Sequence, residues 1–238
     1  MTKFFALDGV GKIKLMRNAR SRNLKIIVRP LRGVSVLIPP LVSFEEAEKF
    51  VHLKKEWIKK TLAGLQQIEK NYTHFNENSI FQTREHRLKL LKHSRNTIQT
   101  VIKNRVIYVF YPDHADIRDE RIQKSIRKAI TEAWRIEAKN FLPGRVRELA
   151  IKHGFKYNRV YIKNAGTRWG SCSSANNINL NVQLMRLPQH LTDYVILHEL
   201  AHTIQKNHGK HFWTLLEKVT GNAKGLDRQL KKFNLNVW

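Results

Sequence analysis

The sequence predicts an α+β fold, in which an antiparallel, β-rich amino-terminal part with one helix precedes a helix-rich second part. Short β-branched runs separated by turn residues characterise residues 1–112. From residue 113 onward, apolar residues recur at helical spacing over long stretches. The chain has 238 residues, 42% hydrophobic and 26% charged, which is enough to bury one substantial core or two small ones. We therefore expect two regions, 1–112 and 113–238.

The first region begins with a predicted hairpin. Residues 24–40 alternate short β-branched runs around a turn at Leu31-Arg32-Gly33. Ser43 and Glu46 have the spacing of a capping box, and apolar residues follow at helical intervals, which predicts a helix from about 44 to 68. Three strands of an antiparallel meander are then expected at residues 86–93, 97–103 and 105–111.

In the second region, helices alternate with short strands. An apolar stripe from Ile122 to Phe141 predicts a long helix that Pro143-Gly144 ends. A second helix is expected to run to His153, with Gly154 in the position of a C-terminal glycine. A polar turn is expected at residues 166–177. Two strands are expected to flank it, one at residues 159–164 and one at residues 178–187. From about Pro188 the pattern is helical again.

This last helical pattern carries the residues best suited to chemistry. His198 and His202 are four residues apart, so on a helix they lie about 40° apart around the axis and project from one face. Two imidazoles so placed can bind one tetrahedral ion, and Glu199 can reach a metal-bound water without being a ligand. The spacing is that of the H-E-x-x-H motif of zinc peptidases. It predicts Zn²⁺ as cofactor.

A catalytic zinc ion takes three protein ligands and leaves its fourth position for water. His208 is the stronger candidate for the third ligand, because residues 203–209 read as a helix end where Asn207 can adopt the left-handed conformation and turn the chain back. For His211 three roles are considered: a substitute ligand, a group that hydrogen-bonds to the ligands, or a donor to the transition state. Arg168 is a further candidate donor.

Two more features accompany the motif. Apolar residues surround Glu199, so its charge is expected to be buried, which is costly unless the carboxylate has a partner or a function. The strand predicted at the start of 178–187 would offer an exposed edge, to which an extended peptide could add by β-augmentation.

The blocks "RWGSCSS", "INLNVQLMRLP" and "DYVILHELAHTIQKNHGKHFW" resemble the YgjP-like metallopeptidase family, which is related to the SprT and WLM zinc peptidases. The stretches "RNLKIIVRPLRGVSVLIPP" and "SFEEAEKFVHLKKEWI" extend the resemblance over most of the chain. It implies a zincin-like α/β metallopeptidase core over 113–238 with an active-site helix. It also implies zinc bound by His198, His202 and His208, with Glu199 as catalytic acid and base, and a signature loop at Arg168–Cys172 near the site.

The expected activity is hydrolysis of a peptide or protein substrate. Three neutral imidazoles would hold Zn²⁺, which lowers the pKa of its water to about 7. Glu199 would take the proton and pass it to the leaving amine. Cys172, between Ser171 and Ser173, is expected to be a structural thiol rather than a nucleophile.

The charge of the chain is unusual, with 44 Lys and Arg against 19 Asp and Glu, or +25. Such a field attracts polyanions, although a merely solvated surface is an equally good interpretation. A second function class is therefore a DNA-associated protein whose zinc site acts on DNA-bound proteins, by analogy with SprT-type relatives that act on protein–DNA crosslinks. Phosphate contacts would come from residues 118–128 and 12–25, but no aromatic and basic motif for base stacking is evident. A third class is an inactive zinc-binding module, which the intact Glu199 disfavours.

Membrane and secretory classes are not expected. Charged residues interrupt the first 16 positions, unlike the apolar core of a signal peptide. No run approaches the roughly 20 apolar residues of a membrane span. A single cysteine cannot form an intrachain disulfide, which fits a cytoplasmic protein.

Overall fold

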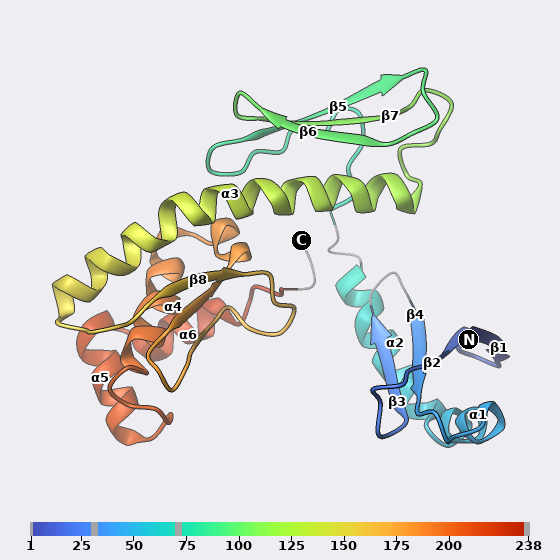
Figure 1. Ribbon diagram of the computed structural model, residues 1–238, viewed down its shortest axis with the longest axis horizontal. Coiled ribbons are helices and arrows are strands. Elements are labelled where there is room, and N and C mark those ends of the chain that lie inside the picture. Colours follow the sequence, from blue (N-terminus) through green and yellow to red (C-terminus); the bar gives the residue numbers. More distant parts are fainter. Residues whose placement is uncertain (1, 30–32, 70–72, 236–238) are drawn as a thin grey trace. The chain divides into compact units, whose positions relative to one another are not determined.

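The computed structural model describes residues 2–29, 33–69 and 73–235. They form a mixed α+β fold, as the sequence predicts, with several small sheets. The chain divides into two compact units, of which the first ends at Thr73 and the second runs from His74 to Leu235. In Figure 1 the first unit is blue to cyan and the second is green to red.

The first unit contains a four-stranded sheet with the order β1-β2-β4-β3. Its strands are β1 (Thr2–Leu7), β2 (Gly11–Arg17), β3 (Lys25–Arg29) and β4 (Gly33–Ile38). β3 and β4 form the predicted antiparallel hairpin, whose turn residues 31 and 32 lie outside the described residues. β2 and β4 are parallel, so the expectation of a purely antiparallel region is wrong. The reason is that β4 inserts between β2 and β3, which follow one another in the chain.

Two helices complete this unit where one was expected. The predicted capping box starts α1 (Phe44–Leu53): Ser43 Oγ accepts from the Glu46 amide at 3.1 Å, and Glu46 Oε2 accepts from the Ser43 amide at 2.8 Å. The helix ends at the cap residue Lys54, and α2 (Lys55–Glu69) follows. α1 packs on β4 and α2 packs on β3. The interruption of the expected single helix at Lys54 therefore lets each of the two helices lie against a different strand.

The second unit is built around α3 (Glu120–His153), a helix of 34 residues. Pro143 lies inside it, so the helix end expected at Pro143-Gly144 is wrong. A proline removes one backbone hydrogen bond, but Leu142 and Val146 are fully buried on either side and hold the helix in place. Figure 1 shows α3 bending along its length. Gly154 ends it as predicted, with a φ of 73° that favours glycine.

A three-stranded sheet lies on one side of α3, with the order β5-β7-β6. Its strands are β5 (Arg87–His93), β6 (Gln99–Lys103) and β7 (Val106–Pro112). β7 is antiparallel to β6 but parallel to β5, because it inserts between them, so the predicted antiparallel meander is wrong. β6 and β7 pack against α3. The division between the units therefore falls after residue 73, whereas the change from strands to helices suggested residue 112.

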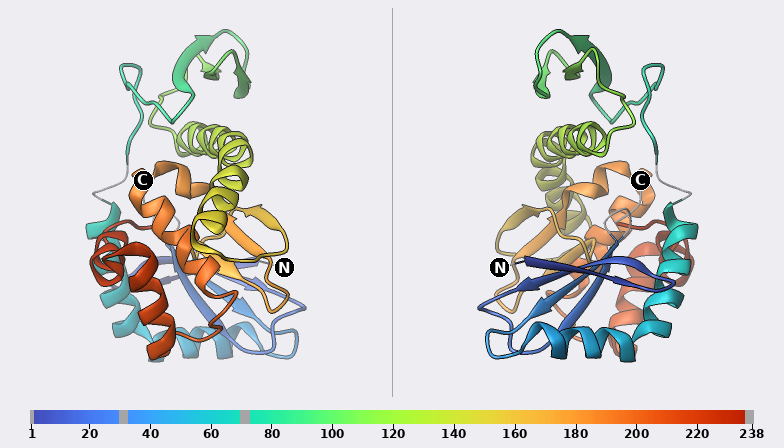
Figure 2. Two further views of the ribbon diagram at one scale, coloured as in Figure 1. Left: turned by 90° about the vertical axis from the view of Figure 1, so that its left-hand side faces the viewer. Right: turned by 90° about the vertical axis from the view of Figure 1, so that its right-hand side faces the viewer.

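A second sheet and three helices occupy the other side of α3 (Figures 1 and 2). The sheet has the order β8-β10-β9, and β10 is parallel to β8 and antiparallel to β9. These elements are β8 (Val160–Lys163), β9 (Gly170–Cys172), β10 (Ile178–Asn181), the 3₁₀ helix η1 (Val182–Arg186), α4 (Gln189–Ala201), α5 (Lys210–Thr220) and α6 (Ala223–Leu230). The strand expected over 178–187 ends at Asn181, because the Asn181 side chain accepts a hydrogen bond from the Gln183 amide and starts η1.

No helix in the described part of the chain has the length and the hydropathy that crossing a bilayer requires.

Candidate metal centre

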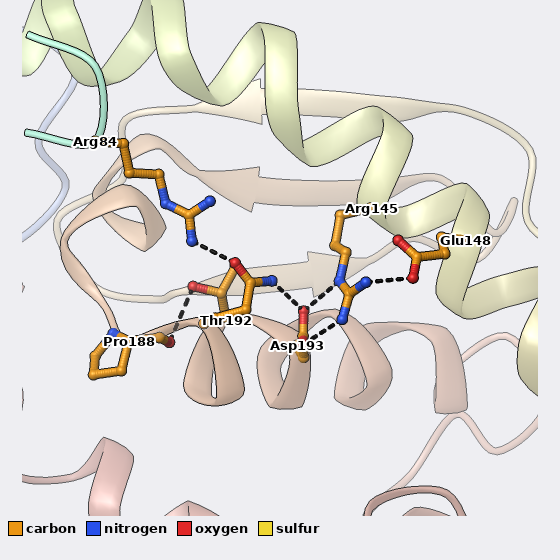
Figure 3. A network of polar contacts seen from close by, with 7 residues as sticks. Arg84, Arg145, Glu148, Pro188, Thr192 and Asp193 are labelled. Atoms are coloured by element: carbon orange, nitrogen blue, oxygen red, sulfur yellow. Dashed lines mark hydrogen bonds and ion pairs between the residues drawn. The ribbon is translucent and has the colours of Figure 1, made fainter.

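The histidine motif lies on α4, which is buried over most of its surface. Asp193 on this helix accepts two hydrogen bonds from Arg145 of α3, from Nε at 2.7 Å and from Nη2 at 2.6 Å (Figure 3). The Gln189 side chain donates to the same carboxylate at 2.7 Å. The Thr192 hydroxyl donates to the carbonyl of Leu184 at 3.1 Å. These contacts, together with the apolar packing, fix the orientation of α4.

The structure brings the three predicted ligands together. His198 lies in the last turn of α4, His202 is its C-terminal cap, and His208 lies in the loop before α5. The Nε2 atom of His208 is 3.0 Å from Nε2 of His198 and 3.2 Å from Nε2 of His202. All three ligand atoms lie within 4.8 Å of one another, and no other such group of histidine, cysteine or acidic side chains occurs among the described residues.

This spacing fits a tetrahedral zinc ion. Zn–N bonds of about 2.0–2.1 Å at the tetrahedral angle place two nitrogen ligands about 3.3 Å apart. His202 Nδ1 lies 2.9 Å from the carbonyl of Gln205, and donating a proton there leaves the Nε2 lone pair for a metal. Burial lowers the pKa of His198 to about 4, with neighbouring histidines adding to the effect, and burial also lowers the pKa of His202. Both rings are thus neutral at pH 7, which is the form that binds metal.

Phe212 supports the cluster from α5. Its fully buried ring packs against all three imidazoles, with centroids 4.9 Å from His198, 4.5 Å from His202 and 4.7 Å from His208. The predicted role of Asn207 is wrong, because its φ is not positive. The chain turns earlier instead, through backbone hydrogen bonds that residues 203–205 make to the end of α4.

Glu199 is buried, with 6% of its surface exposed. Burial raises the pKa of its carboxyl to about 8, and the positive charge of Arg168 acts in the opposite direction. Gly170 on β9 lies directly against it: a Cβ atom at this position would be 2.7 Å from both Cγ and Oε1 of Glu199. Only glycine permits this close approach of strand and carboxylate. The Arg168–Cys172 loop thus forms one wall beside the acid.

A buried amide holds this loop in place. Asn181, 2% exposed, donates from Nδ2 to the carbonyls of Ala165 at 2.6 Å and Arg168 at 2.8 Å. Its backbone amide donates to the carbonyl of Trp169 at 2.9 Å. Asn181 was not predicted as a site residue; asparagines at alternate positions of the expected strand, Asn179 and Asn181, were the signal that could have found it. A pocket of about 260 Å³ adjoins the loop, with Arg168 and Trp169 in its wall.

The remaining candidates lie outside the histidine cluster. His211 is exposed on the first turn of α5 and is not one of the three converging ligands. Arg168 is exposed and acts on Glu199 through its charge. Cys172 on β9 is half-buried, and burial raises the pKa of its thiol. A protonated thiol is a poor nucleophile, in keeping with the structural role expected of it.

The sheet edge expected for peptide binding was the strand that begins at Ile178, but in the structure an edge lies one strand away, at β9. β10 is central in its sheet, between β8 and β9, so it offers no free edge and that expectation is wrong. The reason is that the polar turn after β8 contains β9, which pairs with β10 from Gly170 to Cys172. In the described part of the chain, β9 is paired on one side only.

Comparison with known proteins is informative at the level of the family. No curated protein matches the chain. The metallopeptidase zymogen abylysin of Pyrococcus abyssi is 25% identical, with a TM-score of 0.35 over 39% of this chain and 95% of that one. The metallopeptidase zymogen jannalysin of Methanocaldococcus jannaschii is 24% identical, with a TM-score of 0.34 over 38% of this chain and 93% of that one. The YgjP-like family, described as a metallopeptidase domain, matches residues 22–233. Since this match spans most of the sequence, the chain belongs to the YgjP-like metallopeptidase family.

Proposed function

We propose that the chain is a zinc-dependent peptidase that hydrolyses peptide bonds in peptide or protein substrates, with a zincin-like core within residues 113–238. The observation that carries this proposal is the convergence of His198, His202 and His208 within 4.8 Å, with the buried acid Glu199 on the same helix as the first two. A zinc ion bound there supplies Lewis acidity and a water molecule of lowered pKa.

The protein side chains supply the proton transfers and the electrostatics. Glu199 accepts a proton from the attacking water at its carboxylate and delivers it to the leaving amine. Burial raises the pKa of Glu199 to about 8 and so disfavours the ionised form that accepts the proton. The charge of Arg168 acts in the opposite direction, and a cation held by the three histidines would add to that effect. Arg168 is also our candidate donor to the charge that develops on the substrate carbonyl. No contact of His211 with the described residues supports that role for it.

The substrate backbone is best accommodated along β9. An extended peptide can add to a strand that is paired on one side only, through main-chain hydrogen bonds. β9 is such a strand among the described residues, and Gly170 in it touches Glu199. A peptide added to this edge would therefore pass close to the catalytic acid.

Three variants test the assignment through two separate readouts, zinc content and cleavage of casein or a peptide library. Glu199→Gln keeps the size of the side chain but removes the base, so we expect wild-type zinc content and a loss of hydrolysis of about 100-fold or more. His208→Ala is expected to lose zinc. His211→Ala is the matched control and is expected to keep both zinc and activity. Hydrolysis by Glu199→Gln, or full zinc content in His208→Ala, would refute the proposed site.

The basic residues near the start of α3 give little support to the alternative of a DNA-associated protein. Arg118 pairs with Asp116 and Arg121 with Asp119, each at 2.9 Å. Two of the cations expected to contact phosphates therefore already have acidic partners. The alternative of an inactive zinc-binding module leaves the buried Glu199 without a purpose. We place the enzyme in the cytoplasm, a proposal that the single cysteine supports.

A further inference from the structure

The sheet β5-β7-β6 turns one face to α3 and the other face away from it (Figures 1 and 2). The face toward α3 carries the buried side chains of Leu88, Ile107 and Val109. Because side chains alternate along a strand, their sequence neighbours lie on the opposite face. The strand register places these residues there: Arg87, Lys89, Leu91 and His93 of β5, Tyr108 and Phe110 of β7, and Gln99, Val101 and Lys103 of β6.

The middle of this outer face is aromatic and apolar. Tyr108 and Phe110 are two residues apart on the central strand, with ring centroids 6.1 Å apart and planes only 14° apart. The His93 ring lies edge-on to Phe110 at 6.2 Å. Leu91 and Val101, on the flanking strands, are 39% and 46% exposed. A contiguous apolar strip of this kind on a protein surface is typical of a binding site.

Positive charge borders the strip, and no acidic side chain among the described residues pairs with it. Arg87, Lys89 and Lys103 are exposed, and none of them forms an ion pair among the described residues. The three strands contain no acidic residue at all. The remaining cation of β5, Lys92, points to the opposite face and pairs with Glu77 at 2.7 Å. The outer face therefore combines aromatic rings with cations that have no acidic partner in the described part of the chain.

Hydrogen bonds attach the chain just before β5 to α3. Glu137 of α3 is fully buried and accepts hydrogen bonds from the amide of Glu85 at 3.0 Å and, through the same oxygen, from Nδ1 of His86 at 2.7 Å. His86 directly precedes β5. The rings on the outer face are thus presented by a sheet anchored to the longest helix, which limits the entropy lost when a ligand binds.

We propose that this face binds single-stranded RNA, whose unpaired bases stack on Tyr108 and Phe110 while Arg87, Lys89 and Lys103 contact the phosphates. Aromatic side chains stack on the face of any base, and neighbouring cations hold the backbone. Paired bases in a duplex are covered on both faces by their neighbours, so a sheet face with two half-buried rings, whose remaining surface is open to a base, favours an unpaired strand. Loops and single strands with unstacked bases are the parts of RNA that proteins recognise in this way.

The same chemistry was not evident in the sequence, where no base-stacking motif is contiguous. The rings come from one strand and the cations from the two strands that flank it, and β7 lies between β5 and β6 against the order of the chain. The proposal is independent of the metal centre and of peptidase activity. RNA binding should therefore be unchanged in Glu199→Gln, which separates the two proposals experimentally.

The test is fluorescence anisotropy of a labelled 12-nucleotide oligo(U) RNA with the whole chain at low salt. We expect wild type to bind it at least about tenfold more tightly than a 12-base-pair RNA duplex, because only the single strand exposes its bases. Tyr108→Ala with Phe110→Ala should weaken binding by about tenfold or more, since each stacked base contributes a factor of that order. Tyr108→Phe with Phe110→Tyr preserves both rings and should bind within about threefold of wild type.

A second pair of variants does not depend on the aromatic residues. Lys89→Gln with Lys103→Gln removes two phosphate contacts and should reduce the slope of log affinity against log salt by about 1.4, at about 0.7 for each contact. Lys218→Gln with Lys224→Gln removes the same charge from exposed positions on α5 and α6 and should leave the slope unchanged. Circular dichroism verifies that each variant is folded. If the aromatic double variant does not fold, the salt dependence of the Lys89 and Lys103 variant decides whether this face binds RNA.

Four results would overturn the proposal. They are absence of oligo(U) binding by wild type, unchanged affinity in the folded aromatic double variant, equal slopes in the two lysine pairs, and a tenfold preference for oligo(dT) over oligo(U).

Discussion

Alanine at position 170 would place a methyl group where the Glu199 carboxylate lies. The new Cβ would be 2.7 Å from Cγ and Oε1 of Glu199 and 3.0 Å from Cδ. Non-bonded heavy atoms prefer separations of about 3.5 Å or more, so one group has to move by roughly 0.8 Å. Glu199 is only 6% exposed and has little room to move. We therefore expect Gly170→Ala to displace the Glu199 carboxylate, to which we assign the proton transfers.

The size of the effect follows from that displacement. A misplacement of about 1 Å at a reacting group costs on the order of 100-fold in rate, so we expect kcat/KM for peptide hydrolysis to fall by roughly this factor. Overpacking of a buried site lowers the free energy of unfolding by about 1–3 kcal/mol. The φ angle of Gly170 is not positive, so backbone strain adds nothing and the effect comes from the methyl group alone.

Three measurements on Gly170→Ala are informative: peptide hydrolysis, bound zinc and urea unfolding. Gly144→Ala is the matched control, because a Cβ at this exposed position in α3 meets nothing within 4 Å. Its activity should equal that of wild type, and its free energy of unfolding should rise by about 0.5–1 kcal/mol. Wild-type activity in Gly170→Ala would refute the reasoning. A loss of activity that is fully explained by a lower zinc content would refute it too.

Three further predictions concern the support of the site. Asn181→Ala removes two donated hydrogen bonds and one accepted bond from a buried position, so the free energy of unfolding in urea should fall by about 2–4 kcal/mol; a change below about 0.5 kcal/mol would contradict this role. Arg145→Ala breaks the paired contact between α3 and Asp193 and should cost about 1.5–3 kcal/mol. Arg135→Ala, which breaks an ion pair within α3, should cost less than about 0.5 kcal/mol, and equal losses would show that the link between the helices is unimportant. Chelation by EDTA should lower the thermal midpoint, because the metal binds only the folded arrangement of three histidines; added zinc should restore it, and an unchanged midpoint would exclude tight metal binding at this cluster.

The predictions that hold are those that depend on short-range geometry. Helical spacing places His198 and His202 on one face whatever surrounds them, and their Nε2 atoms both approach His208. The capping box at Ser43 forms as expected, because both of its hydrogen bonds close within three residues. Gly154 likewise ends α3, because a positive φ is a local requirement.

The predictions that fail concern contacts between distant segments. Nothing local indicates that β7 inserts between β5 and β6, or that β9 forms and moves β10 to the centre of its sheet. Pro143 indicates a helix end, but the burial of Leu142 and Val146 outweighs the hydrogen bond that proline removes. In each case, packing against α3 or a neighbouring strand overrides the local preference.

By itself, the amino-acid sequence determined the α+β class, the placement of His198 and His202 on one helix face and the resemblance to the family, since helical periodicity and motif spacing act within a few turns of chain. Tertiary structure alone decided that Gly170 touches Glu199, that Asn181 holds the loop beside it and that Phe212 packs against all three imidazoles. The same is true of the aromatic and basic face on β5-β7-β6. These contacts join residues far apart in the chain, and their free energy arises only when strands and helices are packed together.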